Sequence, residues 1–184
     1  MYYKLSDFYK RDTSFVFDEE KNYPIGYFDL MSGKAIKVVT TLIYTVDKID
    51  TYLDKYDILP TIGAPLVSRK FREVFNESVD LEYYPVQIQD KKGNTNDNFL
   101  CLNILNVIPC VDKEKSVFEI DEDGDYEIKK LYIQQDALGV HSIVRMKEHT
   151  SYIIVTETFK QIVEKAKMKG FNFIEEGNSI YTDI

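Results

Sequence analysis

The amino-acid sequence predicts an α+β protein, with a mixed or mainly antiparallel sheet and at least two helices packed on it. Of the 184 residues, 44% are hydrophobic and 29% are charged, which is enough apolar material for a core without disulfide or metal staples. Segments rich in β-branched and aromatic residues recur between turn sequences. Two other segments place apolar residues three or four apart behind a Ser or Thr, a pattern typical of capped helices.

The first part of the chain, residues 1–56, is predicted to be rich in strands. Val, Ile, Tyr, Phe and Thr are concentrated in three segments, at residues 14–17, 23–30 and 35–46. Apolar residues then recur at helical spacing from Val46 to Tyr56, which predicts a short amphipathic helix. We expect all 184 residues to form a single domain, because no repeat or low-complexity linker divides them.

The second part, residues 57–174, is predicted to hold the core of the fold. Ser68 is a good N-cap for a helix whose apolar face begins at Phe71. Near the end of this part Thr156 caps a longer helix, and Gly170 suits the position just past that helix. Further strands are expected at residues 128–133, 143–146, 152–155 and 171–174.

One segment of the core is apolar on both of its faces. Residues 99–107 alternate as a strand does, yet hydrophobic side chains fall on either side, which indicates a central strand that is covered twice. Residues 81–89 are expected to form a hairpin with it, and Pro85 favours an edge position or a bulge there. A C-terminal tail, residues 175–184, follows the core.

The charge of the chain restricts its partners. A net charge of −8, from 31 acidic and 23 basic residues, argues against nucleic acid or an anionic membrane and suits a basic protein partner. No long apolar span and no secretion signal is recognisable, so we expect a cytoplasmic protein. Cys101 and Cys110 are expected to be buried, reduced thiols, and no motif indicates a cofactor.

Acidic residues are concentrated directly after Phe118. Three aspartates alternate from residue 121 as in a calcium loop, but Tyr126 and Tyr132 stand where that loop needs Gly and Glu, so we expect no metal. Six acids and no Lys or Arg lie between residues 116 and 128, so we expect an acidic hairpin turn over residues 119–127 that meets a basic surface. The predicted partner-binding residues are Glu119, Asp121, Glu122, Asp123, Asp125 and Tyr126.

An enzymatic alternative would use polar groups near Asp112, Ser116 and His141. Asp112 and Ser116 follow an apolar strand, where such side chains either form a polar site or cap a turn by binding backbone N–H groups, and we favour the turn. No nucleophile signature flanks either cysteine, and the two His and two Cys match no common metal spacing. We therefore predict no catalytic residue. A third alternative is a structural interaction module with another partner.

Three segments together carry a resemblance to a known family. They are residues 64–68 (APLVS) with 69–75 and 84–86 (YPV), residues 102–107 (LNILNV) with 110–112 (CVD) and 116, and residues 153–157 (IIVTE) with 169–173 (KGFNF). In this order they resemble the bacterial immunity-protein family of polymorphic toxin systems, formerly catalogued as a domain of unknown function. The resemblance covers roughly residues 57–173 and does not clearly match the N-terminal strands. Thr156 stands where the pattern expects Ser, which is a tolerable change of N-cap.

This resemblance implies a function that chemistry alone does not supply. Members of the family are small proteins encoded beside toxins, which bind and neutralise the cognate toxin. The family has no catalytic motif to carry over, so the matched residues imply a shared fold. The sequence is therefore interpreted as a non-catalytic immunity protein whose partner is a toxin with a basic surface.

Overall fold

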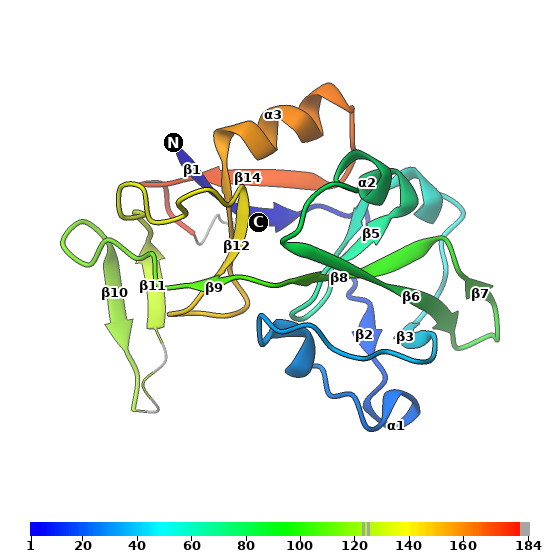
Figure 1. The fold of residues 1–184 in the computed structure, drawn as a ribbon. Helices are drawn as coiled ribbons and strands as arrows, with labels where there is room; N and C mark the ends of the chain where they lie inside the picture. Colours follow the sequence, from blue (N-terminus) through cyan, green and yellow to red (C-terminus); the bar gives the residue numbers. More distant parts are fainter. Residues whose placement is uncertain (123, 125, 181–184) are drawn as a thin grey trace.

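The computed structural model describes residues 1–122, 124 and 126–180, and within them the strands form three sheets (Figure 1). Strands make up 37% of the chain and helices 14%, with a single helix of seven or more residues among the described ones. The prediction of an α+β fold with at least two packed helices is therefore wrong, and the fold is mostly β. Of the segments predicted as helices, α2 (Arg69–Val74) has only six residues, and the segment from Val46 to Tyr56 is not an α-helix.

The elements have the following bounds. The strands are β1 Tyr2–Asp7, β2 Val16–Phe17, β3 Leu42–Val46, β4 Ile58–Leu59, β5 Leu66–Ser68, β6 Leu81–Asp90, β7 Thr95–Asn96, β8 Phe99–Ile104, β9 Val107–Ile108, β10 Val117–Ile120, β11 Tyr126–Lys130, β12 Ile143–Met146, β13 Ile153–Thr156 and β14 Phe171–Glu175. The helices are α1 Glu19–Asn22, α2 Arg69–Val74 and α3 Glu157–Lys165, and the 3-10 helices are η1 Asp29–Met31 and η2 Leu53–Lys55.

Pairing between the strands is mainly antiparallel. The largest sheet has the order β2-β3-β6-β8-β5-β4, with β7 paired to β6, and the second has the order β14-β1-β13-β12-β9. The third is a hairpin of β10 and β11 that projects from one end of the molecule (Figure 1). Among the described pairs, β3 with β6 and β9 with β12 are parallel, and the others are antiparallel.

The strand β8 confirms the prediction of a doubly covered strand. All six of its residues are buried. Phe99 and Cys101 enter a core on one face of the large sheet, whereas Leu100, Leu102 and Ile104 enter another core on the opposite face. The strand ends earlier than predicted, because the chain leaves the large sheet after Ile104 and continues as β9 in the second sheet.

The hairpin predicted between residues 81–89 and 99–107 is also present. β6 pairs with β8 from Leu81 to Pro85 and with β3 from Val86 onward. Pro85 is therefore in an interior strand, not at an edge, but it lies one residue before the point at which pairing with β3 begins. A residue without an N–H group is tolerated where the ladder on one side has not yet started.

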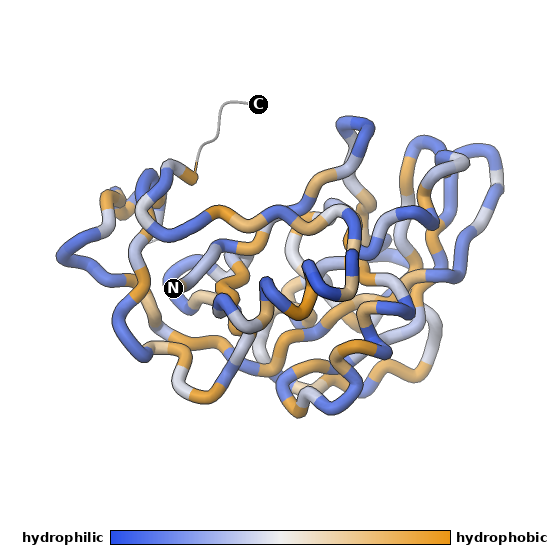
Figure 2. Tube along the Cα trace, turned by 90° about the horizontal axis from the view of Figure 1, so that it is seen from above, coloured by the Kyte–Doolittle hydropathy of each residue, from blue (hydrophilic) through white to orange (hydrophobic). Residues whose placement is uncertain are grey.

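The buried hydrophobic residues form three cores between the layers of the fold. The first lies between the large sheet and the N-terminal segment, and the second lies between the two larger sheets beneath α2 and α3. The third lies between the five-stranded sheet and the hairpin, where Ile128 of β11 meets Val144 and Ile154. Figure 2 shows hydrophobic residues along the interior strands and hydrophilic residues in the peripheral loops.

Both predicted N-caps are confirmed. Ser68 Oγ accepts a hydrogen bond from the N–H of Phe71 at 3.2 Å, and Thr156 Oγ1 accepts one from the N–H of Phe159 at 3.3 Å. Each cap satisfies a backbone donor that a helix start leaves unpaired. Phe71 and Phe159 are fully buried and point into the second core, so α2 and α3 are held by the same aromatic cluster.

The predicted end of the last helix is wrong. α3 ends at Lys165 with Ala166 as its C-cap, and Lys167, not Gly170, has the left-handed backbone conformation that follows, with φ +52°. Gly170 also has a positive φ, but its role is close packing. A Cβ atom at this position would lie 2.8 Å from the carbonyl oxygen of Ile58, so only glycine fits.

Most of the N-terminal segment is less regular than predicted. Residues 23–30 form turns leading into η1 instead of a strand, because the Asp29 carboxylate accepts the N–H of Gly26 at 2.8 Å and closes a turn. Only the end of the segment 35–46 is a strand, β3. The helix predicted from Val46 to Tyr56 is replaced by turns and η2.

A buried arginine connects the two larger sheets. Arg145 of β12 is fully buried, and its guanidinium donates to the carbonyl oxygens of Thr150 at 2.8 Å and Gly63 at 3.4 Å. Among the described residues no acidic side chain pairs with it, and its Nε has no partner. Burial lowers the pKa of Arg145 to about 10, so the side chain still carries a charge at neutral pH.

Replacement of Arg145 tests whether its shape or its charge matters. We expect Arg145→Ala to lower the free energy of unfolding by about 3 kcal/mol, because it opens a cavity and leaves two carbonyl groups without a donor. Arg145→Met fills the space without a desolvated charge and should lose less than about half of that. Urea unfolding at pH 7 measures both, with the exposed Arg72→Ala as the control. Equal losses in the two Arg145 variants would show that the charge itself holds the sheets together.

Candidate functional site

The structure separates the residues of the enzymatic alternative. Asp112 Oδ1 accepts the backbone N–H groups of Glu114 and Lys115, each at 3.2 Å. Ser116 Oγ accepts the N–H of Tyr132 at 2.9 Å and donates to the carbonyl oxygen of the same residue at 3.1 Å. These bonds confirm the interpretation of Asp112 and Ser116 as a capped turn, and they leave neither side chain pointing to a shared site.

His141 is engaged elsewhere. Its Nδ1 lies 2.9 Å from Asp80 Oδ2 and 3.3 Å from the side-chain nitrogen of Asn106. Asn106 Nδ2 also donates to the other carboxylate oxygen of Asp80 at 2.7 Å. The three side chains form a polar cluster where β8 passes into β9, so the sequence hypothesis that joined His141 with Asp112 and Ser116 is not supported by these contacts.

The two cysteines are buried and free, as predicted. Desolvation raises the pKa of Cys101 to about 11 and that of Cys110 to about 12, so both thiols are protonated at neutral pH. Tyr44 and Cys101 share a contact of 3.5 Å between the phenol oxygen and the sulfur. Neither thiol has the exposure or the lowered pKa of a nucleophile.

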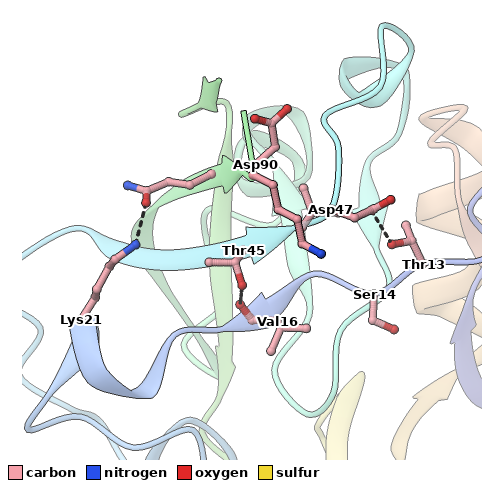
Figure 3. Close-up of a pocket in the computed structure, with 10 residues that line it drawn as sticks. Thr13, Ser14, Val16, Lys21, Thr45, Asp47 and Asp90 are labelled. Carbon is pink, nitrogen blue, oxygen red and sulfur yellow. Dashed lines mark hydrogen bonds between the residues drawn. The ribbon is translucent and has the colours of Figure 1, made fainter. Parts of the chain in front are cut away.

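A shallow pocket of about 400 Å³ lies beside β2, at the ends of β3 and β6 (Figure 3). The two carboxylates that line it already have partners within the protein. Asp90 accepts four hydrogen bonds from Ile49, Lys92 and Asn94, and those bonds, foremost the one from the Asn94 side chain, lower its pKa to about 2. Asp47 pairs with Arg11 at 2.7 Å. The polar groups of this pocket therefore stabilise the fold.

The part of the chain that the structure describes lacks the features of a metal site and of a membrane-spanning helix. It contains no group of three or more His, Cys, Asp or Glu residues placed to hold a metal ion. Asp123 and Asp125 of the calcium-like pattern lie outside the described residues. Within the described ranges, no helix is long and apolar enough to cross a membrane.

The acidic segment forms the hairpin of β10 and β11. Glu119 lies in β10 and Tyr126 in β11, so the predicted turn over residues 119–127 is shorter than expected. On the inner face, the rings of Phe118 and Tyr126 are in contact, with centroids 5.0 Å apart and planes tilted by 31°. Both pack on the third core beside the fully buried Ile128. This packing fixes the hairpin to the body of the protein and leaves its acids on the exposed side.

The outer face of the hairpin carries opposed acids. Glu119 is directly opposite Glu127 in the register of the two strands, and both are exposed. Like charges in such a pair destabilise a hairpin, and Lys129 offsets this by pairing with Glu119. No basic side chain of the described chain pairs with Glu127. The exposed Asp121 and Glu122 continue the negative surface toward the turn.

Four exposed residues of strands β10 and β11 were not included among the predicted contacts. They are Val117, Ile120, Glu127 and Lys129. Val117 and Ile120 are 51% and 55% exposed, the highest exposures of large apolar side chains in the described strands. The β-branched and aromatic residues Val117, Phe118 and Ile120 were a usable signal for a strand, but the acidic residues favoured the interpretation as a turn.

Comparison with known proteins gives the class of the chain. A family model described as "Immunity protein family" matches residues 32–178, which is most of the sequence. The chain therefore belongs to the immunity proteins. The particular family is the one designated Imm11. The match begins ahead of β3, so it extends further toward the N-terminus than the resemblance that starts at residue 57. The search of curated proteins found no match.

Thiol labelling tests whether either cysteine is available for chemistry. We expect Cys101 and Cys110 in the native protein to react with a thiol reagent at pH 8 at least about a hundredfold more slowly than in urea, because both are buried and protonated. The absorbance of the released chromophore measures the rate, and the urea-unfolded protein is the control for two reactive thiols. Rapid labelling of either residue in the native protein would contradict the assignment of both as structural.

Proposed function

We propose that this protein binds a cognate toxin and neutralises it by covering the surface through which the toxin acts, without a catalytic step of its own. Membership of the immunity protein family is the observation that carries the proposal. The internal hydrogen bonds of Asp112, Ser116 and His141 support it, because they occupy the groups that an enzymatic alternative requires.

The acidic hairpin is the proposed contact surface. It projects from one end of the molecule (Figure 1), it carries Glu119, Asp121, Glu122 and Glu127 on exposed positions, and Tyr126 lies beside its turn, opposite Ile120. Complementary charge between two partners increases their association rate and orients them. We therefore propose a toxin with a basic surface as the partner, and we place their encounter in the cytoplasm, where reduced thiols such as Cys101 and Cys110 are usual.

The direct experiment is capture of the toxin encoded by the neighbouring gene. The purified chain should retain that toxin domain on a resin and should protect cells that express it. Protection without binding, or binding without protection, would contradict neutralisation by direct contact.

Charge reversal tests the contact surface. We expect the combined variant Glu119→Lys, Asp121→Lys and Glu122→Lys to slow association with the toxin by about tenfold and to flatten its dependence on salt. Stopped-flow or biolayer measurements at several salt concentrations give both quantities.

The matched control reverses three exposed acids outside the hairpin, Glu73, Glu77 and Glu164, and changes the net charge by the same amount. It should leave the association rate within about twofold of the original protein. Equal slowing by the two triple variants would attribute the effect to net charge and remove the hairpin from the contact surface.

A further inference from the structure

The two outer edges of the hairpin differ. On the β11 side the chain returns: Lys130 forms a bridge with Ser179, and the N–H of Ile180 donates to the carbonyl oxygen of Lys129 at 3.2 Å. On the β10 side no strand within residues 1–122, 124 and 126–180 pairs with Val117–Ile120. The backbone donors and acceptors on that side of β10 are therefore open to another chain.

Proteins usually protect such an edge with lysine, proline or a covering loop. β10 contains neither lysine nor proline, and no described strand covers its outer edge: its sequence is Val-Phe-Glu-Ile. Val117 and Ile120 are 51% and 55% exposed, and the single acid between them is opposed by Glu127 across the hairpin. An edge of this kind is suited to pairing with a strand of another protein.

The other long edge strand, β14, is less suited than β10 to pairing with another chain. β14 has five residues and lies at the edge of the second sheet. Its exposed residues are Asn172 and Glu175, whereas its aromatic and aliphatic side chains are partly buried. The remaining described edge strands outside the hairpin, β2, β4, β7 and β9, have two residues each. Among the described edges, β10 thus combines an open ladder of four residues with exposed apolar side chains.

We propose that the toxin adds a β-strand to the free edge of β10. This inference rests on the proposed function, and it specifies how the toxin would contact the hairpin. In strand addition the backbone hydrogen bonds provide affinity, and side chains on the two faces provide specificity.

The side chains on the two faces of β10 indicate which residue types the added strand would carry. Side chains alternate between faces, so Glu119 is on the outer face with Glu127, and Phe118 and Ile120 are on the inner face. A neighbouring strand that places Lys or Arg on the outer face would pair with Glu119 and reduce the repulsion between the two glutamates. An apolar residue on its inner face would cover Ile120. The partner segment is therefore a strand in which basic and apolar residues alternate.

The test uses the toxin domain encoded by the neighbouring gene as the probe. The variant Val117→Lys with Ile120→Lys places two charges on the edge, and we expect the dissociation constant to rise by at least about thirtyfold. The control, Val79→Lys with Val140→Lys, adds the same charge at positions that are 87% and 97% exposed and lie outside the hairpin. Its affinity should match that of the original protein. Calorimetric titration gives the affinities.

Amide hydrogen exchange supplies a readout that does not depend on any variant. In the complex with the unaltered protein, the β10 amides that are not bonded to β11 should exchange at least about tenfold more slowly than in the free protein. Unchanged exchange there, in a complex that does form, would overturn strand addition and leave the proposed function standing. Unchanged affinity of the Val117 and Ile120 variant would do the same. Failure of the unaltered protein to bind the toxin would overturn both proposals.

Discussion

The fold depends on one stretch of chain, Phe99–Ile108, that has to pair in two sheets. As β8 it lies at the centre of the large sheet with every residue buried, and as β9 it pairs in parallel with β12 of the second sheet. The crossing is fixed by Asp80, whose carbonyl oxygen accepts the N–H of Leu105 at 2.8 Å and whose carboxylate holds Asn106 and His141. Polar partners at this point let the backbone leave one ladder and enter the next without unpaired groups.

The same constraint explains the buried charge and the position of the hairpin. Val144 and Met146 of β12 enter the third core, so Arg145 lies on the opposite face, near Tyr44 and Cys101. No carboxylate of the described residues pairs with it there. The exit of β9 then leads through the Asp112–Ser116 turn into β10. The capped turn and the third core together set the hairpin against the far face of the second sheet, so the acidic surface is attached to the body at a fixed place.

The sequence predicted an element correctly where its local residue pattern agrees with the packing in the folded protein. Both faces of β8 were apolar, its hairpin with β6 had a polar loop, and the caps at Ser68 and Thr156 are local hydrogen bonds. The class was wrong because helical spacing alone does not create a helix. Asp50, in the segment from Val46 to Tyr56, binds Tyr9 and Arg11, and these distant contacts hold that segment as turns.

The candidate site could be predicted only in part for a similar reason. A run of acids is visible in the sequence, and so is the failure of the calcium pattern. The open edge of β10 is not visible, because it depends on the return of Ser179 and Ile180 to the opposite edge of the hairpin. The opposed pair of Glu119 and Glu127 likewise depends on the register, which a bulge beside Val117 sets.

Neutralisation of a cognate toxin by direct occupation, as proposed above, requires a fixed stoichiometry and leaves the toxin chemically unchanged. The most direct measurement is a titration of the toxin's activity with this chain, followed by separation of the two proteins in denaturant and refolding of the toxin. Occlusion predicts a linear loss of activity that is complete at a fixed molar ratio, and full recovery of activity after separation. Loss of activity at far smaller amounts of this chain, or a toxin that stays inactive after separation, would contradict the account.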